Sequence, residues 1–245
     1  MSSSARCWRA ATSPGSRVVR RRGRSRTRWR AEMAARAAGF YPIFVEAAGR
    51  RCVVIGGGPV AEGKVSGLLA AGADVTVVSP TLNGPLTDAV RAARIRHRRR
   101  RYRHGDLAGA ALAFAATGDV AVNAAVAAEG RKRGVWVNTA DDPAHCDFIL
   151  PAVVRRGALA IAVSTGGASP AAARAIREEL ERAIGADYAA LVDIAAAVRG
   201  ALRAGGVAVT ADVWRAALAD REFRRLVARG RQEAARRRLH GLLTC

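Results

Sequence analysis

The 245-residue sequence is poor in aromatic and acidic residues and has no long apolar run. Aromatic residues make up only 5% of the chain, and 20 acidic residues face 41 basic ones. No stretch of about 18 uncharged apolar residues occurs, which excludes a transmembrane helix. Half of the residues are hydrophobic, so small aliphatic side chains must supply the core, and disorder along the whole chain is excluded.

Cysteine is scarce and shows no paired spacing. Cys7, Cys52, Cys146 and Cys245 stand far apart, without a C-x-x-C pair. This spacing is typical neither of a disulfide framework nor of a zinc ribbon. Free thiols indicate a reducing compartment, so we expect a cytoplasmic protein.

Basic charge is concentrated at the start of the chain. Residues 1–32 hold ten arginines and one acid, and carry +9 of the net charge of +21. Residues 1–38 lack hydrophobic periodicity, so we expect a disordered basic leader. Such a leader is typical of targeting peptides, and a simpler hypothesis is that translation starts at Met33. No motif indicates a specific nucleic-acid partner, so any binding of nucleic acid would be salt-sensitive and non-specific.

A glycine motif follows the first predicted strand. Residues 51–55 form a short β-branched apolar run, and GGGPVA follows at residues 56–61. This is G-x-G-x-x-A, the phosphate-binding pattern of Rossmann domains. Gly56 permits the tight turn, and Gly58 lets a pyrophosphate approach the backbone. The predicted helix over 60–71 points its N-terminal N–H groups at the phosphates, so the motif predicts a dinucleotide site.

The second predicted strand, residues 74–78, completes a βαβ unit of the expected length. Its end offers Ser79-Pro80-Thr81, where Asp or Glu usually binds the adenosine ribose. Only hydroxyl and backbone groups are available here, and no arginine follows at once. This strand therefore does not decide between NAD and NADP.

A dense basic run occupies residues 94–104, with seven arginines and two histidines. One interpretation is a solvated edge strand and loop, whose charge blocks further strand pairing. The other is a rim that attracts anions. The sequence leaves both interpretations open.

Further strands and one helix extend the pattern. Residues 110–116 and 135–138 are predicted strands, and residues 120–133 between them are a predicted helix that ends at Gly134. We therefore predict an α/β fold, with a Rossmann-type doubly wound parallel sheet in a domain over residues 39–147.

The second half of the sequence does not continue the pattern of the parallel sheet. Residues 148–154 and 159–164 form a predicted hairpin, followed by a helix over 170–184 that Ser169 caps. We assign 148–185 to a small α+β segment and 186–245 to a helical C-terminal subdomain. That subdomain is expected to contain helices over 188–202, from Thr210 or Asp212, and over 220–243.

Two long motifs carry a resemblance to a known family. They are YPIFVEAAGRRCVVIGGGPVAEGK and VNTADDPAHCDFILPAVVRRGALAIAVSTGGASPAAARAIREELE, within residues 40–184. The chain resembles precorrin-2 dehydrogenases, the N-terminal module of siroheme synthases, some of which are also sirohydrochlorin ferrochelatases. No methyltransferase module follows, so the stand-alone form is expected. Asp142 and Pro59 depart from the residues that are common in the family.

The resemblance implies a function and a set of site residues. The expected reaction is NAD-dependent oxidation of precorrin-2 to sirohydrochlorin, in siroheme or cobalamin biosynthesis, by a homodimer that exchanges contacts through its central segment. The implied catalytic residue is Asp141, and no metal site is predicted. The implied cofactor contacts are Gly56, Gly57, Gly58, Pro59, Val60, Ser79, Pro80, Thr81 and Thr117. The implied substrate contacts are Asn138, Ser164, Thr165, Gly166, Gly167 and Ser169.

Several roles stay open at this stage. Asp141 is the candidate base, because it is expected at the mouth of the crevice and is the residue that the family motif supplies. Repulsion from a substrate with eight carboxylates would raise its pKa, which suits acid–base work. Asp142 either couples to Asp141 or caps a turn. Four arginines either bind the substrate or are exposed charges: Arg155, Arg156, Arg174 and Arg177. The alternative functions are an added ferrochelatase activity and a non-catalytic NAD-responsive binding module.

Overall fold

The computed structural model describes residues 39–140 and 142–244. The predicted basic leader, the alternative start at Met33 and the predicted base Asp141 lie outside the described residues. Within the described ranges, no helix combines the length and the apolar character that crossing a membrane requires.

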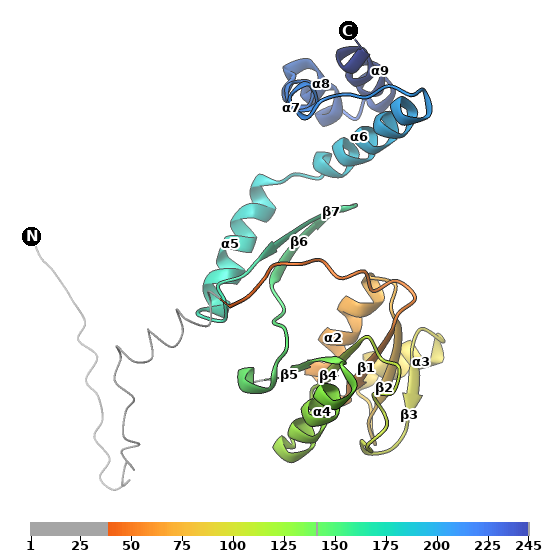
Figure 1. Ribbon diagram of the computed structural model, residues 1–245, viewed down its shortest axis with the longest axis vertical. Helices are drawn as coiled ribbons and strands as arrows, with labels where there is room; N and C mark the ends of the chain where they lie inside the picture. Colours follow the sequence, from red (N-terminus) through yellow and green to blue (C-terminus); the bar gives the residue numbers. More distant parts are fainter. Residues whose placement is uncertain (1–38, 141, 245) are drawn as a thin grey trace, which may run out of the picture.

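A five-stranded parallel sheet forms the first half of the described chain (Figure 1). Its order is β3-β2-β1-β4-β5, and every neighbouring pair is parallel. The central strands consist of short apolar runs that are buried on both faces, as parallel sheets require. The strands are β1 (Arg51–Ile55), β2 (Asp74–Val78), β3 (Arg96–Arg98), β4 (Leu112–Ala115) and β5 (Trp136–Thr139).

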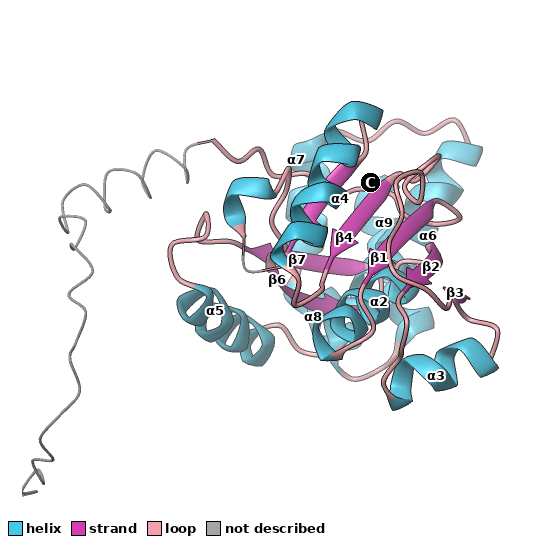
Figure 2. Ribbon diagram, turned by 90° about the horizontal axis from the view of Figure 1, so that it is seen from below, coloured by secondary structure: helices cyan, strands magenta, loops and turns pink. Residues whose placement is uncertain are grey.

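Helices cover both faces of this sheet (Figure 2). The helices are α2 (Pro59–Ala70), α3 (Gly84–Arg91) and α4 (Val120–Arg133). Side chains alternate along each strand, so Val54 packs in one cluster with residues of α2 and α3, while Val53 packs in the other with Val126 of α4. This arrangement confirms the predicted Rossmann-type fold.

The position of α4 is set by its ends and by one glycine. Asp119 accepts hydrogen bonds from the N–H groups of the first turn, and Gly134 ends the helix in the left-handed conformation, with φ 67°. A Cβ on Gly130 would lie 2.2 Å from Val137 Cγ2. Gly130 therefore allows α4 to approach β5 closely.

A buried carboxylate ties α4 to the loop after β3. Glu129 is 1% exposed and accepts hydrogen bonds from Tyr102 Oη at 2.6 Å, Gly105 N at 3.0 Å and Leu107 N at 3.3 Å. Arg133 Nε also donates to it, at 2.6 Å. Burial opposes ionisation of Glu129, but these hydrogen bonds outweigh burial and lower its pKa. Glu129 therefore satisfies several donors that the fold removes from water.

A second buried carboxylate holds the basic run. Asp106 is 3% exposed and accepts hydrogen bonds from Arg98 at 2.8 Å and from both terminal nitrogens of Arg100, at 2.6 and 2.7 Å. Burial opposes its ionisation, but hydrogen bonds from Arg100, the Arg103 N–H and Arg98 lower the pKa of Asp106 to about 2. The basic run thus forms the edge strand β3 and a loop that Asp106 fixes.

An antiparallel hairpin follows the sheet. Strands β6 (Ala152–Arg156) and β7 (Leu159–Val163) pair with each other and lead into α5 (Pro170–Ala183). The predicted hairpin is confirmed, although its first strand begins at Ala152 instead of Phe148. Ser169 caps α5 as predicted, because its Oγ accepts the N–H of Ala172 at 3.2 Å. In Figure 1 the hairpin and α5 lie between the parallel sheet and the C-terminal helices.

The last part of the described chain is helical and has its own core. Its helices are α6 (Asp187–Ala204), α7 (Ala211–Ala219), α8 (Arg221–Ala228) and α9 (Gln232–Thr244). Phe223 and Leu239 are fully buried in this core. The predicted single helix over 220–243 is wrong, because Gly230 adopts φ +68° and separates α8 from α9.

Candidate functional site

Three glycines at the end of β1 have different structural roles. Gly56 has φ 126°, and a Cβ there would lie 2.3 Å from the Ala116 carbonyl oxygen. A Cβ on Gly57 would lie 2.0 Å from the carbonyl oxygen of Thr81. A Cβ on Gly58 would meet nothing within 4 Å. The fold therefore requires the first two glycines, whereas Gly58 leaves open space at the N-terminus of α2.

The predicted cofactor residues gather around this turn. The N–H of Gly56 donates to Val78 O at 3.0 Å, and the N–H of Asn83 donates to Gly57 O at 2.9 Å, so the segment after β2 lies against the turn. Thr117 follows β4, and its Oγ1 donates to Asn123 Oδ1 at 2.7 Å. Three strand ends thus meet at one edge of the sheet, where dinucleotides bind in this fold. The open space beside Gly58 fits a pyrophosphate at the start of α2.

Replacing Gly58 should weaken cofactor binding without changing the stability of the fold. Because nothing lies within 4 Å of the added Cβ, we expect Gly58→Val to keep the fold but to fill the space that a pyrophosphate needs. Affinity for NAD(H), measured by calorimetry, should fall by at least about tenfold, with little change in thermal unfolding. Gly57→Ala is the contrasting variant, which should destabilise the protein because of the Thr81 carbonyl. Unchanged NAD(H) affinity in Gly58→Val would place the phosphates elsewhere.

The loop after β5, residues 140–147, is closed by the thiol of Cys146. The N–H of Thr139 donates to Cys146 Sγ at 3.2 Å, and the thiol lies 3.2 Å from Thr139 O and 3.3 Å from Asp142 O. Burial raises the pKa of Cys146, which keeps the thiol protonated and able to donate. Thr139 Oγ1 also donates to His145 O at 3.0 Å. These contacts hold together the two ends of the loop that contains Asp141 in the sequence.

The same loop covers the free edge of β5. The N–H of Val137 donates to Asp147 Oδ2 at 2.8 Å, and the N–H of Asp147 donates to Val137 O at 2.8 Å. Asn138 was predicted to contact substrate; its Nδ2 donates to Phe148 O at 3.0 Å, and its side chain is buried. Asn138 therefore holds the loop, and its contact with substrate stays a prediction.

Asp142 has the capping role that was one of its two predicted roles. Its carboxylate accepts the N–H of Ala144 at 3.1 Å and lies 2.6 Å from Nδ1 of His145. The hydrogen bond from His145 lowers the pKa of Asp142. Apart from the closeness of the two residues in the chain, no sequence pattern predicts this contact with His145. Coupling between Asp142 and Asp141 stays a prediction.

The predicted substrate turn between β7 and α5 is stabilised by its own hydroxyl groups. Thr165 Oγ1 donates to Ser169 O at 3.1 Å and accepts the Ser169 N–H at 3.0 Å, while Ser164 Oγ accepts the N–H of Gly166. Gly166 and Gly167 have positive φ, of 60° and 83°. Within residues 39–140 and 142–244, no hydrogen bond joins this turn to the glycine turn after β1. Its contact with substrate stays a prediction.

The four arginines of the central segment divide into two pairs. Arg156 donates to Ile184 O at 3.0 Å and to Glu181, and Arg177 forms ion pairs with Glu178 and Glu181. Both side chains support the packing of the hairpin against α5. Arg155 and Arg174 are exposed, and within the described part of the chain they form no ion pair. They remain the candidates for contact with a carboxylated substrate.

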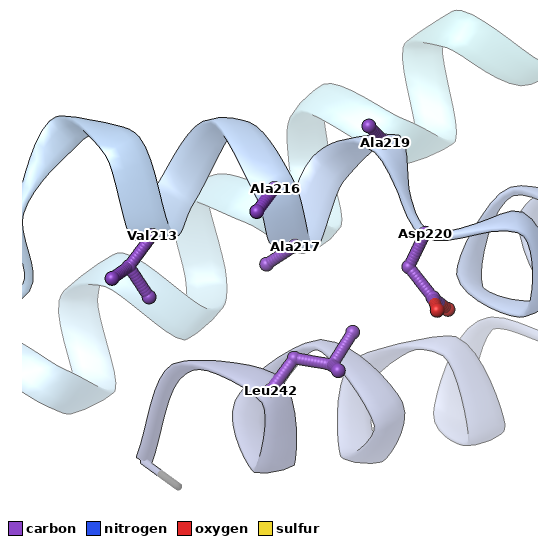
Figure 3. A pocket seen from close by; sticks show the side chains of 6 residues that line it. All are labelled: Val213, Ala216, Ala217, Ala219, Asp220 and Leu242. Carbon is purple, nitrogen blue, oxygen red and sulfur yellow. The ribbon is translucent and has the colours of Figure 1, made fainter.

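Two hollows of the described surface lie among the C-terminal helices. One, of about 290 Å³, is shallow and mainly apolar, with Val213, Ala217 and Leu242 among its lining residues (Figure 3). Its single charged group, Asp220, is bonded to Arg238 and to the N–H of Phe223. The hollow therefore offers no free group for catalysis. Across the described residues, no cluster of three or more His, Cys, Asp and Glu side chains is arranged to hold a metal ion.

Two family models match successive parts of the chain. A model for NAD(P)-binding domains matches residues 43–152, which include the sheet and the glycine turn. A model described as the central part of sirohaem biosynthesis proteins matches residues 156–183, which include β7 and α5. The first match supports a nicotinamide cofactor for this domain, and it agrees with the geometry that makes the edge at β1, β2 and β4 the candidate site.

Siroheme synthases are similar to this chain over much of its length. A siroheme synthase of Methylobacillus flagellatus is 44% identical over 162 residues, which is 66% of this chain and 35% of that protein. A siroheme synthase of Photobacterium profundum is 37% identical over 205 residues, which is 83% of this chain and 44% of that protein. The chain thus spans less than half the length of these two relatives.

A solved structure matches the chain over most of its length. It is that of SirC, a precorrin-2 dehydrogenase, with a TM-score of 0.63 and 25% sequence identity over 82% of this chain and 100% of that one. The likeness extends beyond the NAD(P)-binding half, because that half alone could not account for so much of the chain. Together with both family models and the siroheme synthase relatives, this shows that the chain is similar to siroheme synthases and precorrin-2 dehydrogenases in both its NAD(P)-binding half and its central segment.

Proposed function

We propose that the chain oxidises precorrin-2 to sirohydrochlorin, with NAD⁺ as the hydride acceptor. The observation that carries the proposal is the likeness to a precorrin-2 dehydrogenase over 82% of this chain, in a fold whose glycine turn is open at Gly58. In this reaction the substrate loses one hydride and one proton, and bound NAD⁺ supplies the acceptor for the hydride.

The chain has two tasks in this proposal. The open start of α2 and the segments after β2 and β4 bind the dinucleotide at the carboxyl edge of the sheet. The loop closed by Cys146 carries Asp141, the residue that we propose takes the proton, and β5 directs this loop to the same edge. Substrate and cofactor would then meet where the strands end.

The proposed assembly is a homodimer. Phe40, Ile43 and Phe44 are 39%, 53% and 74% exposed, and Leu150 and Ile176 are nearly half exposed, so a second copy would cover apolar surface near the hairpin. The proposal includes exchange of contacts through the hairpin and α5, which would bring the Ser164–Ser169 turn of one copy to the edge of the other. A cytoplasmic location belongs to the same proposal and rests on the free thiols Cys52 and Cys146.

Anaerobic turnover of enzymatically generated precorrin-2 with NAD⁺ tests the function. We expect NADH to form in a one-to-one ratio with sirohydrochlorin, which is followed by its absorption spectrum. A folded protein that binds NAD⁺ but forms neither product would contradict the proposal and favour a non-catalytic binding module. Adding Fe²⁺ after the oxidation tests the alternative ferrochelatase activity, because metal insertion changes the spectrum of the product.

A further inference from the structure

The end of β2 lacks the carboxylate that selects NAD. In Rossmann domains an Asp or Glu at this position accepts a hydrogen bond from the adenosine 2′-hydroxyl and repels a 2′-phosphate. Here β2 is followed by Ser79-Pro80-Thr81, and Ser79 is 7% exposed. The nearby Glu62 carboxylate already accepts a hydrogen bond from Asn83 Nδ2 at 2.6 Å. The place of the adenosine ribose therefore presents no carboxylate from β2.

The basic loop after β3 lies directly beside that place. Strands β2 and β3 are parallel, with Val78 opposite Arg98, and the N–H of Ser79 donates to Arg98 O at 3.2 Å. The ring of His97 lies 2.9 Å from Ser79 O through its Nε2. The N–H of Arg100 donates to Arg98 O at 2.8 Å, so the chain turns at Arg99. Arg99 thus follows directly on Arg98, whose carbonyl oxygen is bonded to the end of β2, and it lies in the turn that starts there.

The guanidinium groups of this loop differ in their partners. Arg98 and Arg100 share the single negative charge of Asp106, which holds the loop in place. Arg99 and Arg101 are exposed, and in the described residues neither side chain forms an ion pair or a hydrogen bond. Arg103, further along the loop, is likewise exposed and has no described ion pair. The loop therefore combines a fixed backbone with exposed, unpaired guanidinium groups, of which Arg99 follows directly on the residue bonded to β2, and this arrangement suits a phosphate group.

We propose that Arg99, supported by Arg101, binds the adenosine 2′-phosphate of NADP, so that the cofactor site accepts NADP⁺ as well as NAD⁺. The inference rests on the nicotinamide site of the proposed function and adds the chemistry of its adenosine end. It assigns to the loop after β3 the anion-binding role that the sequence alone left open. The edge-strand role of β3 itself is compatible with it, because Arg96 pairs with Asp74 at the other end of the strand.

Calorimetry with adenosine bisphosphates tests the proposal without turnover. We expect the full chain to bind adenosine 2′,5′-bisphosphate at least about tenfold more tightly than 5′-AMP, since a phosphate bound by arginine is a charge-assisted contact. Adenosine 3′,5′-bisphosphate has the same charge in the wrong position and should show no such gain. Equal binding of the two bisphosphates would mean general attraction to basic charge and would overturn the proposal.

Two variants assign the effect to residues. Arg99→Ala should remove most of the tenfold preference for the 2′-phosphate and leave 5′-AMP affinity unchanged. Arg131→Ala removes one exposed arginine from the far end of α4 and should keep the preference, so it controls for net charge. A preference that persists in Arg99→Ala and in the Arg99→Ala/Arg101→Ala double variant would overturn the assignment.

Turnover separates this inference from the proposed function. With precorrin-2 as substrate, NADP⁺ should support oxidation in the wild type, and Arg99→Ala should raise its KM about tenfold while leaving that for NAD⁺ unchanged. Turnover with NAD⁺ alone would overturn the inference and leave the function intact. Selective binding of the 2′-phosphate without turnover by either cofactor would contradict the proposed function and leave the inference intact.

Discussion

Asp141→Ala should lower the rate of precorrin-2 oxidation by about 10²–10⁴-fold, the usual contribution of a positioned general base. Binding of NAD⁺ should be retained, because the open turn at Gly58 and the segment after β2 do not include this residue. The loss should appear in kcat, since a base acts in the chemical step. Single-turnover kinetics with saturating NAD⁺, together with calorimetry of NAD⁺ binding, would measure both quantities.

A variant of the neighbouring residue, Asp142, provides the comparison for the loss of kcat in Asp141→Ala. Asp142→Asn keeps an oxygen that can accept the N–H of Ala144, but it removes the charge beside His145. We expect this variant to lose less than about tenfold in kcat, because the cap survives. Equal losses in both variants would mean that the two carboxylates act as one coupled pair. Full activity of Asp141→Ala would remove Asp141 as the base.

Glu129→Ala should lower the free energy of unfolding by about 3–5 kcal/mol, the range for removing one partner of a buried charged pair. The variant leaves the hydroxyl of Tyr102 and the N–H groups of Gly105 and Leu107 without their acceptor, and it leaves Arg133 without its partner. Urea unfolding followed by circular dichroism would measure the loss. Hydrogen exchange of the β4 amides would show whether it falls on the sheet.

Two reference variants serve as comparisons for the loss of unfolding free energy in Glu129→Ala. Asp119→Ala removes the exposed cap of the same helix and should cost about 1 kcal/mol. Glu129→Gln keeps an acceptor for the backbone donors and should fall between the two. A loss in Glu129→Ala no larger than that in Asp119→Ala would show that water enters and satisfies the donors.

The sheet and α4 could be predicted because local signals and burial agree there. Residues 52–55 are apolar, and residues 75–78 are apolar except for Thr76, as is typical of strands buried on both faces. Helix α4 runs from an Asp cap to a glycine end. Helix α3 was not predicted. Its first residues are Gly84 and Pro85, which are typical of a turn, and the cap that starts it is the side chain of Asn83.

The break between α8 and α9 could not be predicted, for a different reason. Residues 220–243 have helical apolar spacing throughout, so the pattern predicts one helix. Gly230 adopts a left-handed conformation and lets Phe223 of α8 and Leu239 of α9 enter the same core. A glycine within a helical pattern does not by itself reveal whether packing will favour a turn there.

The site could be predicted only in part. The glycine motif predicted the turn and a class of ligand, because the backbone requires Gly56 and Gly57 and because Gly58 leaves space for a phosphate. The partners of Asp106 could not be predicted, since Arg98 and Arg100 meet it only when the loop after β3 folds against α4. The closure of the Asp141 loop by Cys146 also depends on tertiary contacts. The domain boundaries and the roles of the site residues stay predictions.

The covering of β5 by Asp147 has a consequence for solubility and assembly. An uncovered outer strand is a template for intermolecular β-sheet growth, and such growth leads to aggregation. Here the N–H and C=O of Val137 are both occupied by Asp147, while the opposite outer strand, β3, is three residues long and carries Arg96 and Arg98. Neither outer strand of the five-stranded sheet therefore offers a free edge to a strand from another molecule. Copies of this chain that associate should thus do so without extending the five-stranded sheet, which agrees with the proposed contacts through the hairpin and α5.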